Sequence, residues 1–421
     1  MKPNILFVHA VCPAQFSDLC EYLNTTGTAN AYYMTTPGNI ERNKHRYRNL
    51  IPLMPVGNMM APNSCYYSGK VERAGKVGAG LFRGLKKIIK FLRIDIIVAH
   101  GSWASPHLIF DEFDIPIITY IEFPSYADHG WDAKYPPTEA QRLTDKNMQM
   151  LSYYQVMKSQ QTIVPSEHAK KMFPRKLQSS IVVQFEGFDL NKIAQREPAN
   201  IQLPKGVKTI GFAARDLSSA KGLEVFIKTA EHLSRSNQKI HFVVIGDPKS
   251  TTYGYEGVFL EKKYGKGNPI TFIDHLFKTH KLNGKHFTLT GKLPYPEYSD
   301  LLHKIDLFLY PVQYGSGNWG LLELLIRGCT VIASNRCYVN EIIDHNVNGI
   351  LINSNDPQEW ANSALALLGD DSQRSALGNK ALEMASDYYL PAVSKHYMKI
   401  FTETIQRHKK LRHHSVKDSE G

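Results

Sequence analysis

Short apolar runs alternate with amphipathic stretches along most of this chain. In the first half the pattern predicts a helix at Gln15–Leu23 and strands at Asn4–His9, Ile94–Ala99, Ile115–Tyr120, Gln161–Val164 and Ser180–Phe185. A second series of predicted strands comprises Val207–Phe212, His241–Ile245, Phe287–Leu289, Ile305–Tyr310, Thr330–Ala333 and Gly349–Ile352. Apolar runs of this length, separated by helical patterns, are typical of parallel strands that are buried on both faces.

A polar link rich in Gln, Pro and Asn, Ala194–Gly206, separates the two series. A chain of 421 residues is expected to form two domains, at roughly 150 residues each. Two strand–helix series with one link therefore predict an α/β protein with two Rossmann-like domains, whose parallel sheets face a central cleft.

Composition narrows the class of protein. Hydrophobic residues make up 43% and charged residues 21%, as in an ordinary globular protein, and no apolar run approaches the roughly 18 residues of a membrane span. The five cysteines have no C-x-x-C spacing, so we expect reduced thiols and a cytoplasmic location. The net charge of +11 favours a phosphorylated substrate or an anionic membrane surface over nucleic acid, because no nucleic-acid-reading module is visible.

A glycine-bearing loop, Tyr314–Gly320, runs into a helix that we expect to begin near Leu321. Such a junction offers free N–H groups and the positive end of a helix dipole to an anion. Glu323 would fall in the first turn, where a carboxylate can accept two ribose hydroxyls. The predicted contacts to a nucleotide therefore involve Ser316, Gly317, Asn318, Trp319, Gly320 and Glu323. The alternatives are a plain glycine-rich turn and an acidic residue that merely complements the helix dipole.

Arg215 and Lys221 lie just past a predicted strand and just before a predicted helix. Two cations around one turn can converge on a pyrophosphate and neutralise it as a leaving group. The alternative is that both are solvated surface charges.

The segment Phe287–Ile352 contains a series of motifs, at Pro311, Gly315–Gly320, Glu323, Arg327–Ser334, Asn340–Ile343 and Asn348–Gly349. In these residues it resembles the donor-binding half of retaining glycosyltransferases of family 4 (group 1), which have the two-Rossmann-domain GT-B architecture. The resemblance covers nearly the whole chain, and finer features resemble one subgroup of that family. These features are Val8–Phe16, Ala99–Trp103, Glu122–Phe123, Gly130–Asp132, Tyr135–Pro136, Pro165–Ser166 and Phe173–Pro174.

The resemblance implies an acceptor-binding domain at 1–195, a donor-binding domain at 196–389 and a final helix at 390–412 that packs back on the first domain. It assigns Arg215 and Lys221 to the leaving diphosphate, and the loop Gly291–Lys292–Leu293 to the nucleobase through backbone groups. His100 and Glu122 become catalytic candidates, and His9 and Gln15 become acceptor-side candidates. Core or paired structural roles remain open for His100 and Glu122. The first of the family's two glutamates falls on Gly315, so its role is assigned to no residue here.

The predicted activity is retaining, metal-independent transfer of a sugar from a nucleotide-diphosphate sugar. The acceptor would be a glycan, a lipid-linked sugar or another molecule. The resemblance implies that this transfer is a step in surface polysaccharide or glycoconjugate biosynthesis. No Asp-x-Asp and no metal-ligand spacing occur, so no cofactor is expected. Two alternatives stay open, a nucleotide-sugar epimerase on the same fold and a non-catalytic nucleotide-sugar-binding subunit.

A basic amphipathic helix is predicted at Leu81–Arg93. It has the composition of a helix that lies on anionic lipid at the inner face of a membrane, but its apolar face can equally pack on the sheet.

Overall fold

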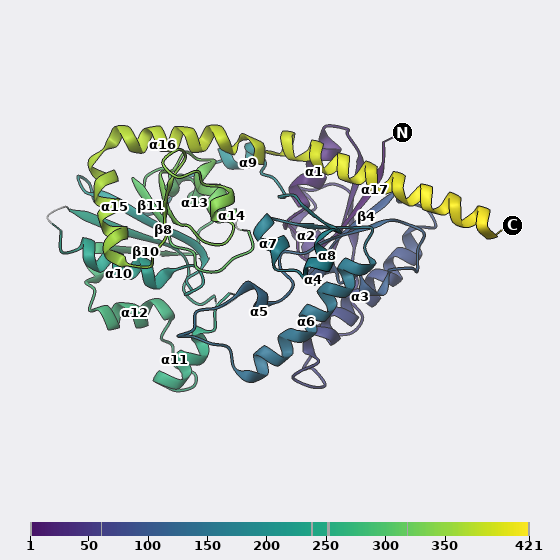
Figure 1. Ribbon diagram of the computed structural model, residues 1–421, viewed down its shortest axis with the longest axis horizontal. Coiled ribbons are helices and arrows are strands. Elements are labelled where there is room, and N and C mark those ends of the chain that lie inside the picture. The colour runs from purple at the N-terminus through teal and green to yellow at the C-terminus, as the bar shows by residue number, and fades with distance from the viewer. Residues whose placement is uncertain (1, 60, 237–238, 251–252, 318, 420–421) are drawn as a thin grey trace. The chain divides into compact units, whose positions relative to one another are not determined.

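The computed structural model describes residues 2–59, 61–236, 239–250, 253–317 and 319–419, with side chains through Arg412 (Figure 1). The chain divides into two compact units, which we describe separately. Unit 1 comprises the described parts of 1–128, 139–189 and 388–421, and unit 2 those of 129–138 and 190–387.

Unit 1 contains a seven-stranded parallel sheet of order β3-β2-β1-β4-β5-β6-β7. Its interior strand β1 sends Ile5 and Phe7 into one core cluster and Leu6 and Val8 into another, because side chains alternate across a strand. The strands are β1 (Asn4–Val8), β2 (Asn30–Thr35), β3 (Leu50–Pro52), β4 (Ile96–His100), β5 (Ile117–Tyr120), β6 (Gln161–Val164) and β7 (Ile181–Val183).

Helices cover both faces of this sheet. The core on one face contains residues of α1 and α17, and the core on the other face contains residues of α3. The helices are α1 (Ser17–Thr25), α2 (Pro37–Asn43), α3 (Gly69–Ile88), α4 (Gly101–Ala104), α5 (Tyr126–His129), α6 (Glu139–Lys158), α7 (Glu167–Lys171), α8 (Arg175–Gln178) and α17 (Leu390–Ser419). The final helix thus contributes Val393, Tyr397 and Phe401 to the core of unit 1 (Figure 1, yellow).

Unit 2 contains a six-stranded parallel sheet of order β10-β9-β8-β11-β12-β13. One face packs against α10, α12 and α15, and the other against α13, α14 and α16. The strands are β8 (Lys208–Asp216), β9 (Ile240–Asp247), β10 (Phe287–Gly291), β11 (Leu307–Tyr310), β12 (Val331–Ser334) and β13 (Ile350–Ile352). The helices are α9 (Leu190–Ala194), α10 (Leu223–Leu233), α11 (Glu256–Tyr264), α12 (Phe272–His280), α13 (Tyr295–Leu302), α14 (Trp319–Leu325), α15 (Pro357–Gly369) and α16 (Asp371–Met384).

All eleven strands that the apolar runs predict are present, within a few residues of their expected ends, and the predicted α/β class is confirmed. Two strands at the edge of the first sheet, β2 and β3, were not predicted. β3 has three residues and ends in a proline, too short for an alternating pattern to appear.

The compact units differ from the expected domain ranges in three places. The second part of unit 1 ends at residue 189 rather than 195, its last part begins at 388 rather than 390, and the segment 129–138 groups with unit 2. Tyr135 explains the third difference, since its ring lies in the core of unit 2 against Phe259 and Phe272.

The helix expected at Leu81–Arg93 is shifted: α3 begins at Gly69 and ends at Ile88. Glycines hid the first part of this helix in the sequence. Two of them allow close packing, because a Cβ on Gly78 would lie 2.8 Å from the Ser105 carbonyl oxygen and one on Gly80 2.2 Å from the Met54 carbonyl oxygen. Leu81, Leu85 and Ile88 are buried against the sheet, so the packed alternative holds for this face. Among the described residues, no helix has the length and apolarity needed to cross a membrane.

Candidate active site

The second sheet reverses its strand order at β8, which pairs with β9 on one side and β11 on the other. Ligands of open parallel sheets bind outside the carboxyl ends of the strands at such a switch point. The loops that leave β8 and β11 are joined here, because the Gln313 and Tyr314 amides donate to the Ala220 carbonyl at 2.9 and 3.1 Å. Gly222 follows with a φ of +82°, and a Cβ there would lie 1.8 Å from the Pro311 carbonyl oxygen, so only glycine fits.

Arg215 and Lys221 converge at this edge. The Arg215 guanidinium lies 5.1 Å and the Lys221 Nζ 4.7 Å from the centroid of the same ring, that of Tyr253. Lys221 is only 8% exposed, whereas the side chain of Arg215 is 63% exposed. Burial opposes the charge of Arg215, but Tyr253 and Asp216 outweigh it and raise the pKa of Arg215. Two cations therefore share one small region of unit 2.

Two buried carboxylates hold the loop that carries these cations. Asp216 is fully buried, accepts a hydrogen bond from the Ser250 hydroxyl and lies 3.4 Å from the Arg215 guanidinium. Glu256 accepts from the Ser219 amide at 2.6 Å and from the Ser219 hydroxyl. Sequence reasoning missed Tyr253 and Glu256, which lie beyond β9 in no recognisable motif, whereas Asp216 stands next to a predicted residue.

The segment 129–138 also reaches this region. The His129 ring stacks on Tyr253 with centroids 5.3 Å apart, and a Cβ on Gly130 would lie 2.5 Å from the Tyr314 ring. Lys134 pairs with Glu224 of α10 at 2.8 Å. Tyr253 therefore contacts both cations on one hand and the 129–138 segment on the other.

The glycine-bearing loop after β11 is closely packed. Ser316 is buried, Gly317 follows it, and Trp319 and Gly320 form the first residues of α14. Asn318, also predicted here, lies outside the described residues. A Cβ on Gly315 would lie 2.9 Å from the ring of Tyr338, which is fully buried. The ring of Tyr338 thus takes the space that a glutamate at position 315 would need.

Glu323 lies differently from the prediction. Because α14 begins at Trp319, Glu323 stands in its second turn rather than its first. Burial raises the pKa of the Glu323 carboxyl, and Arg327 together with hydrogen bonds from Tyr295 and Tyr298 opposes that rise. Arg327 also donates to the Tyr295 hydroxyl at 2.9 Å. Glu323 therefore faces the start of α13, and its ribose contact stays a prediction.

The predicted nucleobase loop precedes α13 directly. Gly291 ends β10 with a φ of +66°, Lys292 is exposed, and Leu293 packs against the core of unit 2. The loop thus lies close in sequence to Tyr295, the tyrosine that bonds Glu323.

In unit 1 the four predicted residues gather at the corresponding edge, where β1 pairs with both β2 and β4. The His9 and His100 rings lie edge to face, with centroids 4.7 Å apart. Gln15 Nε2 donates to Glu122 Oε1 at 2.6 Å. The Trp103 ring stacks on His9 at 5.9 Å and is 36% exposed. Trp103 was part of a predicted motif but was not predicted as a site residue.

Both histidines are buried, and burial lowers the pKa of His9 to about 3 and that of His100 well below its ordinary value. Their Nδ1 atoms accept backbone hydrogen bonds, from Val11 at 2.9 Å and from Ser102 and Trp103 at 3.2 and 3.3 Å. His100 therefore has a structural role, which was the alternative left open for it, because its ring caps the amino end of α4.

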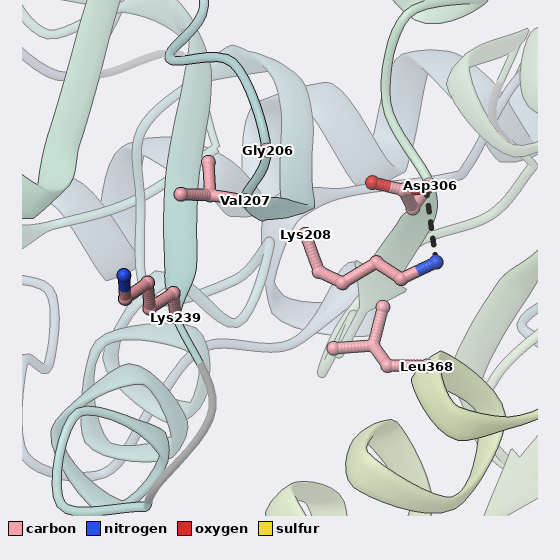
Figure 2. Close-up of a pocket in the computed structure, with 6 residues that line it drawn as sticks. All are labelled: Gly206, Val207, Lys208, Lys239, Asp306 and Leu368. Atoms are coloured by element: carbon pink, nitrogen blue, oxygen red, sulfur yellow. Dashed lines mark ion pairs between the residues drawn. The ribbon is translucent and has the colours of Figure 1, made fainter.

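A separate hollow of about 470 Å³ lies at the amino end of β8, the opposite end from Arg215 (Figure 2). Its lining is Gly206, Val207, Lys208, Lys239, Asp306 and Leu368, with Lys208 Nζ 4.0 Å from Asp306. None of the predicted site residues belongs to this lining. Within the described ranges, no group of three or more His, Cys, Asp or Glu side chains is placed to hold a metal ion.

Two parallel-sheet α/β domains, each with its predicted site residues at the switch point of the sheet, are the architecture of GT-B glycosyltransferases. The family description "Glycosyl transferase family 4 group" matches residues 39–193, and "Glycosyl transferases group 1" matches residues 194–384. The chain belongs to this glycosyltransferase family, as its motifs predicted.

Similar proteins include a D-inositol 3-phosphate glycosyltransferase of Thermobispora bispora, 29% identical over 114 residues. That match covers 27% of each chain, so it spans about a quarter of this relative's length. Among solved structures, sucrose-phosphate synthase of Thermosynechococcus elongatus matches with a TM-score of 0.71 and 15% identity, covering 97% of this chain and 100% of that one. HepE of Anabaena in complex with UDP-glucose matches with a TM-score of 0.65 and 14% identity, over 95% and 99%. These structures support the fold.

Proposed function

We propose that this protein transfers a glycosyl group from a nucleotide-diphosphate sugar to an acceptor hydroxyl, with retention of anomeric configuration. The observation that carries the proposal is the convergence of Arg215 and Lys221 on the Tyr253 ring at the switch point of the second sheet. A pyrophosphate at that edge would meet two cations, one of them nearly buried, where charge is worth more than in water.

In the proposed reaction the bond between the anomeric carbon and the donor phosphate oxygen breaks. The acceptor oxygen forms its bond on the same face, and its proton passes to the departing phosphate oxygen. The chain supplies no covalent nucleophile, and Arg215 and Lys221 stabilise the charge that grows on the diphosphate. These interactions strengthen in the transition state, which is the condition for catalysis.

The donor would lie along the carboxyl edge of unit 2. Its diphosphate would face the loop 315–320, its ribose Glu323, and its base the backbone of 291–293. HepE, similar in fold, binds UDP-glucose. By this analogy a nucleoside diphosphate hexose is the donor class to test first. Acceptors on the way to polysaccharides or glycoconjugates are the proposed class.

We propose further that no metal takes part, because Arg215 and Lys221 would meet the diphosphate charge directly. Transfer measured with EDTA and with added Mg²⁺ or Mn²⁺ tests this. Equal rates are expected, and a rate that falls with EDTA and returns with Mg²⁺ would overturn the metal-independent part alone.

The test of the function is a donor-hydrolysis and transfer assay over a panel of nucleotide sugars. Arg215→Ala and Lys221→Ala are each expected to lower kcat about 10²–10³-fold, as the loss of one electrostatic stabiliser does elsewhere. Lys239→Ala is the matched control, an exposed cation of the same unit at the far edge of the sheet, and is expected to keep the wild-type rate. Full rates in both site variants would remove the assigned site.

One observation favours a second candidate, a nucleotide-sugar-binding protein without turnover. Tyr338 packs where the family's first glutamate would stand, so position 315 cannot carry that carboxylate in this packing. The thermal unfolding temperature distinguishes the candidates when it is measured together with turnover. A donor that raises the unfolding temperature but is not consumed with any of the acceptor extracts tested favours the binding protein over the enzyme.

For location, we propose the cytoplasm, where the five free thiols would stay reduced. Contact with an anionic membrane is proposed for the turn after α3, where Phe91 is 80% exposed beside the exposed Lys87 and Lys90. Sedimentation with vesicles containing anionic lipid, compared with zwitterionic vesicles, tests it. Phe91→Ala is expected to reduce the bound fraction.

A further inference from the structure

The pair His9 and His100 in unit 1 is chemically unusual. Each Nδ1 accepts backbone N–H groups, so the uncharged ring must carry its hydrogen on Nε2. Both Nε2 atoms are buried, and neither has a hydrogen-bond partner among the described residues. Burial lowers the pKa of His9 and the nearby Gln15 side chain opposes that shift, but Nε2 itself has no hydrogen-bond partner. Two N–H donors are therefore left side by side with nothing to accept them.

Buried polar groups almost always have partners, and exceptions call for a missing water, an ion or a ligand. Here the two exceptions are adjacent, since the ring centroids lie 4.7 Å apart, within the span of a single sugar ring. They also lie at the switch point of the first sheet, where ligands of parallel sheets bind. The position and the chemistry agree.

We propose that the Nε2–H groups of His9 and His100 bind hydroxyl oxygens of an uncharged carbohydrate or polyol acceptor. This inference rests on the proposed function and adds the chemical class of the acceptor. A hydroxyl oxygen has two lone pairs for such donors and one hydrogen left to give. Glu122, whose carboxylate accepts a hydrogen bond from Gln15 at 2.6 Å, is the neighbouring group that can accept a hydrogen bond from a second hydroxyl of the ligand.

The charges around the pair favour an uncharged ligand over an anion. Glu122 would repel a phosphate or a carboxylate. Arg73 lies over the Trp103 ring at 4.8 Å and is exposed, so it is not a buried counter-charge. The lowered pKa values of both histidines fit this environment, because a site built for an anion would favour their charged forms. In this role the histidines donate hydrogen bonds and do not act as bases.

Two partly exposed side chains lie against His9. Trp103 stacks on its ring, and Gln15 lies close to it and donates to Glu122. A ligand would reach the donors by displacing them. Trp103 then offers an aromatic surface beside the hydroxyl-binding groups, a combination suited to a sugar ring.

The experiment uses the full chain, with methyl α-glucoside, methyl α-mannoside and myo-inositol as uncharged probes and inorganic phosphate as the anionic one. Binding is measured by calorimetry, and the histidine ring ¹⁵N resonances are followed by NMR. We expect at least one uncharged probe to bind and to shift the Nε2 resonances of both histidines while the rings stay neutral.

His9→Asn and His100→Asn are the test variants, because the amide keeps an acceptor near the Nδ1 position and removes the Nε2–H. Each is expected to weaken probe binding at least tenfold. His107→Asn is the matched control, a partly buried histidine of the same unit whose Nδ1 lies 3.1 Å from the Ser105 carbonyl oxygen, and is expected to bind normally. Thermal unfolding checks that each variant folds; if one does not, the wild-type NMR shifts decide.

Three outcomes would overturn the inference. In the first, phosphate binds and the histidine rings become protonated. In the second, the variants bind the probes as tightly as the wild type, and in the third no uncharged probe binds because only an ordered water occupies the pair. The proposed function fails separately. A chain that binds the probes through these histidines but transfers no sugar from any donor refutes the function and keeps this inference, while unchanged UDP binding in the variants shows that the donor side is intact.

Discussion

The two parallel sheets carry functional groups at the same topological place, yet the two places are opposite in electrostatics. In unit 2 two cations lie over one aromatic ring, and buried Asp216 and Glu256 hold the loop beneath them. In unit 1 burial keeps two imidazoles uncharged, and their Nδ1 atoms accept backbone N–H groups. The comparison teaches that the fold fixes where a ligand binds, whereas the partners of each side chain decide which charge it can carry.

The largest effect is expected from the joint between the loops of unit 2. Gly222→Ala would need a left-handed backbone and would bring its Cβ to 1.8 Å from the Pro311 carbonyl oxygen. We expect a loss of about 3 kcal/mol in the free energy of unfolding, from the combined strain and overlap, and loss of donor binding. Urea denaturation measures it.

The control for Gly222 is Gly257→Ala, which lies in α11 where an added Cβ meets nothing within 4 Å. It is expected to be neutral or stabilising by up to about 1 kcal/mol. If Gly222→Ala were equally harmless, the contact between the loops after β8 and β11 would not be rigid. The loops of unit 2 would then not hold Arg215 and Lys221 in place.

The second largest effect is expected in the pH dependence of the free energy of unfolding, and it comes from the two histidines of unit 1. The folded pKa of His9 lies at about 3, below its ordinary 6.5, so the unfolded chain binds the extra proton first as the pH falls. Stability is therefore complete above pH 6.5 and is lost as the pH falls towards 3, by about 1.4 kcal/mol per pH unit for each such histidine. His100 acts in the same direction.

Urea midpoints at pH 7.5, 6 and 5 measure this slope. His9→Asn is expected to flatten it by about one proton, while replacement of the exposed His396 by Asn serves as the control. An unchanged slope in His9→Asn would mean that folding does not lower the pKa of His9, which contradicts the uncharged site.

The smallest effect concerns Tyr253, the ring between the cations. Tyr253→Leu removes the aromatic face, and we expect about a tenfold loss in affinity for UDP, because cation–π contacts are worth about 1–2 kcal/mol. Tyr253→Phe keeps the face and is expected to bind nearly as well as the wild type. Calorimetric titration with UDP separates the two variants. If the leucine variant binds more tightly, the ring instead competes with the diphosphate for the cations.

The sequence predicted most of the fold, because buried parallel strands such as Gln161–Val164 leave an unmistakable apolar run. It also predicted Arg215 and Lys221 as neighbours, since they flank one turn. Tyr253 was out of reach because the loop after β9 has no motif, and only the fold brings it to the cations. The contact between the His9 and His100 rings could not be predicted either, because 91 positions separate them. Their Nε2 atoms without partners are seen only in the folded structure.

The last helix has a consequence for the order of assembly. Tyr397 and Phe401 are fully buried among residues that the ribosome makes in the first quarter of the chain, such as Phe7 and Phe16. All of unit 2 is synthesised in between. Unit 1 can therefore complete its core only after unit 2 has been made, and until α17 emerges the nascent chain exposes an apolar sheet face that a chaperone would recognise.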